Sequence, residues 1–382
     1  MINVTKLCCG GEFAGDALRY ARGIGGAPVV AWNCTEACNL ACRHCYSEAR
    51  PGRAADELTT DEARGMIEDL AGLGVPVLLF SGGEPLMRGD LFELAAFAAG
   101  KGVRAVLSTN GTLIGASAAR ELRRSGFSYV GISIDGIGEA HDRFRGAAGA
   151  FEAAVGGMRR CLEAGLRTGV RFTLSRPTLA QLGPVIAFAR SSGAARLCVY
   201  HLVPSGRGKG MRREILAPRE ARAAMELIFR EARAAHRSDP SFELLTVDNH
   251  ADGVYLYLRL LMEDPSRAEA AWGLLSAAGG NRSGIGVACV GARGGVFPDQ
   301  FSRAFPLGDV RRRSFSSIWG DEGNLILRQL RSRAGLLKGR CGRCGWKGIC
   351  NGGMRARAMA VHGDPWAEDP GCYLSEGEVA QH

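Results

Sequence analysis

Three cysteines lie close together in the segment "CNLACRHCYSEA", residues 38–49: Cys38, Cys42 and Cys45. They follow the apolar run "PVVAWNCT" at residues 28–35, which predicts a buried strand. Structural zinc sites usually combine paired C-x2-C knuckles and fill all four ligand positions, for which His44 is available. Three thiolates instead leave one iron of a four-iron, four-sulfur cluster open for chemistry. We favour the cluster over zinc on this spacing.

A second cysteine group stands near the C-terminus, in "CGRCGWKGIC" and "DPGCYL": Cys341, Cys344, Cys350 and Cys372. The separate placement of the two groups predicts two metal or iron–sulfur sites. We interpret the second as another four-iron cluster, with a zinc knuckle as the alternative because C-x2-C also suits zinc. Cys289 could replace or add a ligand there. The other cysteines are expected to be small, mostly buried residues: Cys8, Cys9, Cys34, Cys161 and Cys198.

Length and composition are those of an ordinary globular chain. It has 382 residues, of which 46% are hydrophobic and 23% charged, enough for two domains or one large α/β domain with an extension. No apolar run reaches the roughly 18 residues of a spanning helix, and the first residues lack a signal-peptide pattern, so we expect a cytoplasmic protein without a membrane partner. The net charge of +9 suits an anionic substrate, but we favour a solvated basic face as its explanation. No basic stripe interleaved with aromatic residues argues for nucleic acid.

Strand-like and helix-like segments alternate from residue 28 to residue 204. This order predicts an α/β protein with a parallel sheet and right-handed crossovers, but the period alone does not distinguish an open sheet from a curved partial barrel. The expected strands are 28–35, 75–85, 103–111, 129–136, 167–174 and 196–204.

From about residue 205 the regular alternation of strand-like and helix-like segments ends. A charged helix is expected at 217–237 and a small hairpin at "VACVG" and "GGVFPD" (287–291 and 294–299). This part of the chain reads as too irregular to continue the sheet. We therefore expect an N-terminal segment 1–27, a core 28–205, a helical bridging segment 206–280 and a C-terminal domain 281–382.

Chemically capable residues gather where the expected strands end. Ligands of parallel sheets and barrels bind at the carboxyl ends of the strands. The candidates are the cysteine loop, Gly82, Gly83, Glu84, Asn110, Asp135, Arg171 and His201.

The spacing C-x3-C-x2-C, flanked at its last cysteine by His44 and Tyr46 and followed by "SGGEP" at 81–85, resembles the radical S-adenosylmethionine (SAM) enzymes. The resemblance implies a partial (β/α)6 barrel of parallel strands. It also implies a four-iron cluster whose open iron binds the methionine part of SAM, and reductive cleavage of SAM to a 5′-deoxyadenosyl radical. The second cysteine group resembles the auxiliary-cluster (SPASM or twitch) extension that a subset of these enzymes carries.

The same resemblance implies the residues that contact SAM. They are Tyr46, Gly82, Gly83, Glu84, Asn110, Ser133, Asp135 and Arg171. Ser133 and Asp135 are candidates for the ribose, and Arg171 for the methionine carboxylate, which a guanidinium matches bidentately. A solvated strand end and a surface ion pair are the alternatives for these three.

Segments along nearly the whole chain are similar to the enzymes that remodel siroheme side chains. Among these segments are "LSTNGTLI", "HDRFRG", "TVDNHADGVYLYLRLL" and "GDPWAEDPGCYL". These enzymes include 12,18-didecarboxysiroheme deacetylase and a relative from heme d1 biosynthesis. The implied substrate is an iron tetrapyrrole with several carboxylates, which the basic run Arg207, Lys209, Arg212 and Arg213 would suit. This chain departs from the family after "PDQF", where Ser302 to Phe305 replace an expected tryptophan and histidine.

Two other functions stay open at this stage. One is a maturase of the same fold that acts on a peptide or secondary metabolite and inserts sulfur from its auxiliary cluster. The other is a non-catalytic redox or zinc protein, which "SGGEP" and the ordered strand ends argue against. A radical SAM enzyme also needs an electron donor, and we expect a reductase, flavodoxin or ferredoxin.

A polar cluster precedes the apolar helix of "TVDNHADGVYLYLRLL": Asp248, Asn249, His250 and Asp252. As catalytic candidates, His250 could ligate the substrate iron or transfer a proton, and Asp248 could orient it. The alternative is a capping cluster in which Asp248 or Asn249 starts the helix.

Overall fold

The computed structural model describes residues 1–20 and 27–381. The chain divides into two units, a first unit of residues 1–24, 170–282 and 333–382 and a second unit of residues 25–169 and 283–332. Each unit is built from separate stretches of chain, whereas the four predicted segments are continuous. The segment boundaries therefore stay a prediction, and residues 21–26 of the predicted N-terminal segment lie outside the described part.

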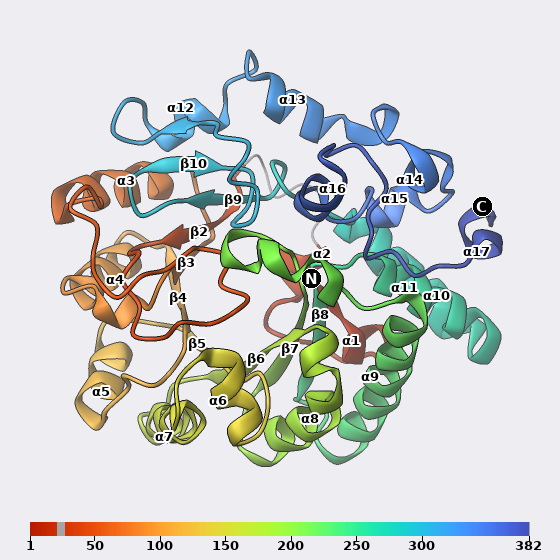
Figure 1. The fold of residues 1–382 in the computed structure, drawn as a ribbon, viewed down its shortest axis with the longest axis horizontal. Coiled ribbons are helices and arrows are strands. Elements are labelled where there is room, and N and C mark those ends of the chain that lie inside the picture. Colours follow the sequence, from red (N-terminus) through yellow and green to blue (C-terminus); the bar gives the residue numbers. More distant parts are fainter. Residues whose placement is uncertain (21–26, 382) are drawn as a thin grey trace. The chain divides into compact units, whose positions relative to one another are not determined.

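Four strands of the second unit follow one another in sequence order and run parallel. Each of them coincides with a predicted strand, and each pairs in parallel with the next. They are β2 (Val29–Asn33), β3 (Val77–Ser81), β4 (Arg104–Thr109) and β5 (Tyr129–Ser133). Helices α3, α4 and α5 lie beside β2, β3 and β4 in Figure 1. The parallel α/β fold class predicted from the sequence is confirmed.

The first helix of the second unit begins where the sequence carries a start signal. Thr59 caps this helix in a capping box with Glu62, which satisfies two otherwise unpaired backbone donors. The helices are α3 (Thr60–Gly72), α4 (Leu91–Gly100), α5 (Ala116–Arg124), α6 (Glu139–Arg145), α7 (Ala150–Glu163), α12 (Phe315–Trp319) and α13 (Leu325–Arg331), with the 3-10 turn η1 (Pro85–Met87).

The predicted hairpin is confirmed, but it is also part of the sheet. Strand β9 (Val287–Val290) pairs antiparallel with β10 (Gly295–Phe297), which pairs with β11 (Gly308–Asp309). On its other side β9 pairs in parallel with β2. The expectation that the chain beyond residue 205 does not continue the sheet is therefore wrong. Ala288, Cys289 and Val290 are buried, so this short strand gains its stability from packing that no local pattern reveals.

The first unit also contains a strand beyond residue 205 that belongs to the sheet, which the sequence analysis did not expect. The chain passes from the second unit into the first within β6 (Thr168–Leu174) and continues to β7 (Arg196–His201). Strand β8 (Glu243–Val247), which the sequence did not predict, pairs in parallel with β7 and is buried throughout. Strand β1 (Ile2–Asn3) pairs antiparallel with β8.

Long and short helices complete the first unit. The predicted helix 217–237 is confirmed as α9 (Pro218–Ser238). The others are α1 (Val4–Cys9), α2 (Asp16–Tyr20), α8 (Leu182–Ser191), α10 (Ala251–Glu263), α11 (Pro265–Ala278), α14 (Gly339–Arg343), α15 (Lys347–Cys350), α16 (Arg355–His362) and α17 (Glu376–Ala380), with the 3-10 segments η2 (Arg176–Gln181), η3 (Gly206–Glu214) and η4 (Arg333–Gly335). Among the described residues, no helix combines the length and apolar character needed to cross a membrane.

Candidate active site

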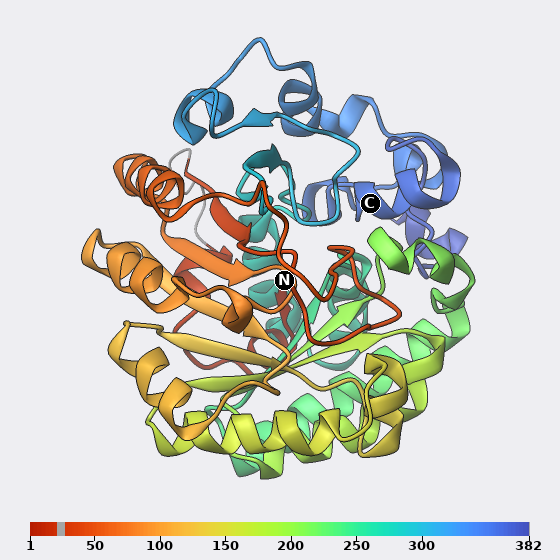
Figure 2. The same ribbon diagram turned by 60° about the vertical axis from the view of Figure 1, so that its left-hand side comes forward.

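The three clustered cysteines lie on the long connection between β2 and α3, drawn in orange-red in Figure 2. A buried carboxylate shapes this connection. Glu57 is 3% exposed and accepts hydrogen bonds from the backbone nitrogen of Glu36 (2.7 Å) and from Thr35 Oγ1 (3.1 Å). The backbone nitrogen of Cys38 donates to the carbonyl of Arg50 at 2.7 Å. Hydrogen bonds within the connection itself therefore hold the cysteine loop in place. Sequence analysis missed Glu57 because no motif marks it.

Each of the three thiols accepts a hydrogen bond. The backbone nitrogens of Leu40 and Ala49 donate to Sγ of Cys38 and Cys45, each at 3.4 Å, and Arg145 donates to Sγ of Cys42 at 3.7 Å. Donors aimed at sulfur stabilise thiolate ligands of a cluster. The chemistry of this donor set fits an iron–sulfur cluster.

The three thiols also affect one another electrostatically. Burial, together with the neighbouring Cys42 and Cys45, raises the pKa of Cys38 to about 11. Burial likewise raises the pKa of Cys42, although the Arg145 guanidinium opposes it. Bound iron must therefore displace protons from these thiols. In the described ranges 1–20 and 27–381, no three His, Cys, Asp or Glu side chains converge closely enough to hold a single metal ion, so the ligand sets stay predictions.

The "SGGEP" turn runs tightly against the cysteine loop. The backbone nitrogen of Gly83 donates to the carbonyl of Thr35 at 2.7 Å, and that of Glu84 to Ala37 at 2.6 Å. A Cβ on Gly83 would lie 2.0 Å from the carbonyl oxygen of Ala37, and Gly82 has a φ of 132°. Only glycine fits at both positions.

Glu84 is fully buried, and its carboxylate is bound by the protein itself. It accepts hydrogen bonds from Thr109 Oγ1 (2.7 Å) and from the backbone nitrogens of Asn110 (2.8 Å) and Leu86 (3.2 Å). Burial raises its pKa, and these three donors oppose the rise. The geometry gives Glu84 a structural role between the ends of β3 and β4, so a direct contact with SAM stays only a prediction.

Tyr46 is tied to the ends of β2 and β3. Its hydroxyl donates to Asn33 Oδ1 at 3.0 Å and lies 2.9 Å from Ser81 Oγ. Its ring meets Phe301 edge-on with the centroids 5.3 Å apart. Asn33 also donates to Sγ of Cys289 at 3.7 Å. The aromatic residue beside the last cysteine is therefore fixed in place.

Asp135 is buried against other side chains at the end of β5. Its carboxylate forms an ion pair with Arg145 (2.5 Å) and lies 3.7 Å from His44 Nε2. The backbone nitrogen of Asp135 donates to Nδ1 of His141 at 3.0 Å, and burial lowers the pKa of His141 to about 4, so that ring is neutral at pH 7. Of the two predicted ribose contacts, Ser133 is half-buried at the end of the same strand.

Arg171 belongs to the first unit. Its guanidinium lies over the ring of Tyr200, 4.3 Å from the centroid. A cation over an aromatic face is attracted to it. The predicted contact of Arg171 with the SAM carboxylate stays a prediction.

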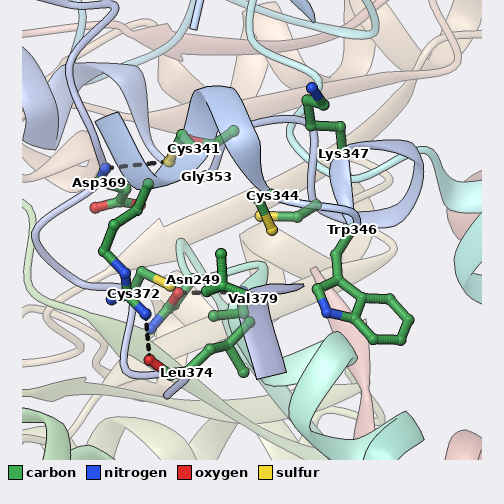
Figure 3. A pocket seen from close by; sticks show the side chains of 14 residues that line it. Asn249, Cys341, Cys344, Trp346, Lys347, Gly353, Asp369, Cys372, Leu374 and Val379 are labelled. Carbon is green, nitrogen blue, oxygen red and sulfur yellow. Dashed lines mark hydrogen bonds between the residues drawn. The ribbon is translucent and has the colours of Figure 1, made fainter. Parts of the chain in front are cut away.

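The second cysteine group lines a pocket in the first unit. Figure 3 shows Cys341, Cys344 and Cys372 around it, and Cys350 also lines it. Sγ of Cys341 accepts a hydrogen bond of 3.4 Å from the backbone nitrogen of Asp369. Burial raises the pKa of Cys350, and the other three thiols raise it further. The structure thus brings the four predicted ligands together, and Cys289 is not among the residues that line the pocket.

The polar cluster before α10 is held in place by buried contacts. Nδ2 of Asn249 donates to the carbonyl of Gly371 at 2.9 Å, and its Oδ1 accepts from the backbone nitrogen of Ala251 at 3.3 Å. His250 is the N-cap residue, without a capping hydrogen bond from its side chain. Asp252 lies between His201 (2.9 Å) and Tyr373 (2.8 Å).

Two members of this cluster were the catalytic candidates. Asp248 has a φ of 66°, and its carbonyl accepts a hydrogen bond from Arg357 at 2.8 Å. His250 is 8% exposed, and burial lowers its pKa well below the usual range. Sequence analysis missed Arg357, which forms a buried ion pair with Asp369 at 2.7 Å. Its guanidinium also donates to the carbonyls of Leu202 and Asp248, which are more than 100 positions away in the sequence.

This geometry agrees with the comparisons with known proteins. The sequence matches the radical SAM superfamily over residues 32–180. It is 46% identical to the Fe-coproporphyrin III synthase of Methanosarcina barkeri over 397 aligned residues, covering 100% of both chains. It is 42% identical to the pre-heme d1 synthase of Dinoroseobacter shibae, covering 94% of this chain and 89% of that protein. The chain belongs to the radical SAM superfamily, and it is an enzyme that uses a four-iron cluster and SAM for radical chemistry.

A solved structure shows the same fold. Streptococcus suis SuiB bound to its precursor peptide SuiA matches with a TM-score of 0.70, covering 91% of this chain and 76% of that chain at 15% identity. Similarity at this level concerns the fold alone.

Proposed function

We propose that this enzyme cleaves SAM reductively and uses the 5′-deoxyadenosyl radical to remodel side chains of a siroheme-derived iron tetrapyrrole in heme or heme d1 biosynthesis. The observation that carries the proposal is the similarity along the full length to proteins named as Fe-coproporphyrin III synthase and pre-heme d1 synthase. Both names refer to iron tetrapyrrole products.

The second unit supplies the residues for SAM cleavage. Cys38, Cys42 and Cys45 would hold the cluster, which supplies the electron that breaks the sulfonium bond. Gly82 and Gly83 hold the turn where SAM's amino group would bind. The tight contact of this turn with the cysteine loop supports the assignment, because two ligand sites must be held at fixed separation for the reaction.

Exposed basic residues on η3 support an anionic substrate. The segment Gly206–Glu214 presents Arg207, Lys209, Arg212 and Arg213, all exposed. Cations clustered on a surface attract and orient polyanions. A tetrapyrrole with several carboxylates has the complementary charge.

We assign a second four-iron cluster to Cys341, Cys344, Cys350 and Cys372. The pocket that these residues share supports this assignment, and so does the pKa of Cys350, which burial and the neighbouring thiols raise. Next to this pocket, Asp248 and His250 are assigned to substrate positioning or proton transfer. A flavodoxin, ferredoxin or reductase would deliver the electron.

The test is a reaction of the anaerobically reconstituted enzyme with SAM, dithionite and 12,18-didecarboxysiroheme. We expect 5′-deoxyadenosine, a Soret shift on substrate binding and a tetrapyrrole product of lower mass. A variant with Cys38, Cys42 and Cys45 replaced by alanine should form no 5′-deoxyadenosine while keeping the iron of the second group. SAM cleavage without any binding of tetrapyrroles would contradict the substrate assignment and favour the peptide or metabolite maturase.

A further inference from the structure

A buried arginine contacts one of the three cysteines of the loop. Arg145 is 7% exposed, and its Nη1 donates to Sγ of Cys42 at 3.7 Å. It is the last residue of α6. Burying a guanidinium costs desolvation energy unless a counter-charge offsets it. The net electrostatic effect of Arg145 on its surroundings therefore depends on the charged groups that contact it.

The counter-charge is Asp135. Its carboxylate lies 2.5 Å from Nη2 of Arg145, and its side chain is fully buried. The backbone nitrogen of Asp135 donates to the neutral ring of His141 at 3.0 Å, which fixes the main chain from which the carboxylate extends toward Arg145. Asp135 is therefore a positioning residue for the guanidinium.

The end of α6 is built against the cysteine loop at three further points. The backbone nitrogen of Arg43 donates to the carbonyl of Phe144 at 3.4 Å. The rings of His44 and Phe144 stack with their centroids 4.5 Å apart. Gly146 has a φ of 74°, and a Cβ there would lie 3.1 Å from the carbonyl oxygen of Ala41. Arg145 is thus held beside Cys42 by the backbone on both sides.

We propose that Arg145 raises the reduction potential of the cluster held by Cys42, and that Asp135 limits this rise. The inference rests on the proposed function only in placing that cluster on Cys38, Cys42 and Cys45. Reduction transfers one electron from an external reductant, such as dithionite, to the cluster and so adds one negative charge. A cation hydrogen-bonded to a ligand sulfur stabilises the reduced form more than the oxidised form. Asp135 opposes this effect because it carries the opposite charge.

The two residues therefore predict shifts of opposite sign. In Arg145→Gln, the ratio of reduced to oxidised cluster at a fixed potential should fall by about tenfold, which corresponds to about 59 mV for one electron. In Asp135→Asn, the ratio should rise, because the guanidinium is no longer neutralised. The measurement is a redox titration of the reconstituted protein by electron paramagnetic resonance, following the signal that changes when SAM is added.

Two further variants separate this effect from misfolding. Arg143→Gln, on the same helix, removes an exposed arginine paired with Glu139 and should leave the potential unchanged. The double variant Arg145→Gln with Asp135→Asn leaves no unpaired buried charge, and its ratio should lie between those of the single variants. Unchanged potentials in both single variants, or shifts in the same direction, would overturn the inference. Absence of a SAM-sensitive signal in the unaltered protein would instead contradict the placement of the cluster.

Discussion

The carboxylate of Glu84 accepts a hydrogen bond of 2.8 Å from the backbone nitrogen of Asn110 and so joins the ends of β3 and β4. Glu84 was expected to face the cofactor, yet its side chain has no exposed surface and three donors of the protein surround it. Its position next to the glycine turn makes it a structural support for the predicted SAM site.

Replacing Glu84 by alanine should therefore act mainly on stability. Two buried donors and the partly buried nitrogen of Leu86 would lose their acceptor. Each buried unpaired donor costs about 1 to 3 kcal/mol, so we expect the free energy of unfolding to fall by about 3 kcal/mol. Urea unfolding of the metal-free protein measures this. Glu93→Ala is the control, because that carboxylate is half exposed and pairs with Arg64 at the surface. A stable Glu84→Ala protein that has lost only SAM binding would restore the direct contact.

Gly83→Ala should damage the site without removing any ligand. The new Cβ would lie 2.0 Å from the carbonyl oxygen of Ala37, so the turn and the cysteine loop must separate. We expect lower iron content after reconstitution and weaker SAM binding. Gly89→Ala should have neither effect, since no atom lies within 4 Å of a Cβ there. Normal iron content and SAM affinity in Gly83→Ala would show that the turn tolerates a side chain.

Arg171→Ala tests the predicted contact of Arg171 with the carboxylate of SAM. Loss of a charge-assisted bidentate contact costs about 1.5 to 3 kcal/mol, so SAM affinity should fall by roughly tenfold or more. Equilibrium binding of SAM to the reconstituted protein is the measurement. Arg190→Ala, which removes a surface pair with Glu231 in the same unit, is the matched control. If the two variants bind SAM equally well, Arg171 serves its contact with Tyr200 and not the cofactor.

The buried His250 should make the free energy of unfolding depend on pH in the acidic range. Burial lowers its pKa in the folded protein, whereas an unfolded histidine titrates near 6.5. Below about pH 6.5 the unfolded chain therefore binds a proton that the folded chain does not bind. The free energy of unfolding should fall by up to about 1.4 kcal/mol per pH unit until the folded pKa is reached.

The measurement is urea unfolding of the metal-free protein at pH 7.5 and 5.5. His250→Gln should lose less stability between these two values than the unaltered protein, while His362→Gln, at an exposed position, should behave like the unaltered protein. Reconstituted His250→Ala should in addition still form 5′-deoxyadenosine but no tetrapyrrole product. An active variant would remove His250 from the catalytic candidates.

Features that depend only on neighbouring residues could be predicted from the sequence. Short stretches of sequence reveal the three cysteines of one loop, the two glycines after a strand and the repeated strand and helix periods. They do so because residue spacing and backbone freedom are properties of neighbouring residues. The predicted strands, helix α9 and the hairpin of β9 and β10 were found in this way. The two cysteine groups were recognised for the same reason.

Features that depend on contacts between residues far apart in the chain could be seen only in the folded protein. Strands β8 and β9 belong to the sheet because their side chains are buried by distant partners, and their short sequences do not reveal it. Glu84 turned inward because Thr109 and Asn110 offer it donors 25 and 26 positions later. Arg145 reaches Cys42 across 103 positions of sequence. A buried charge acquires its role from the partners that folding brings to it, and no pattern of neighbouring residues encodes those partners.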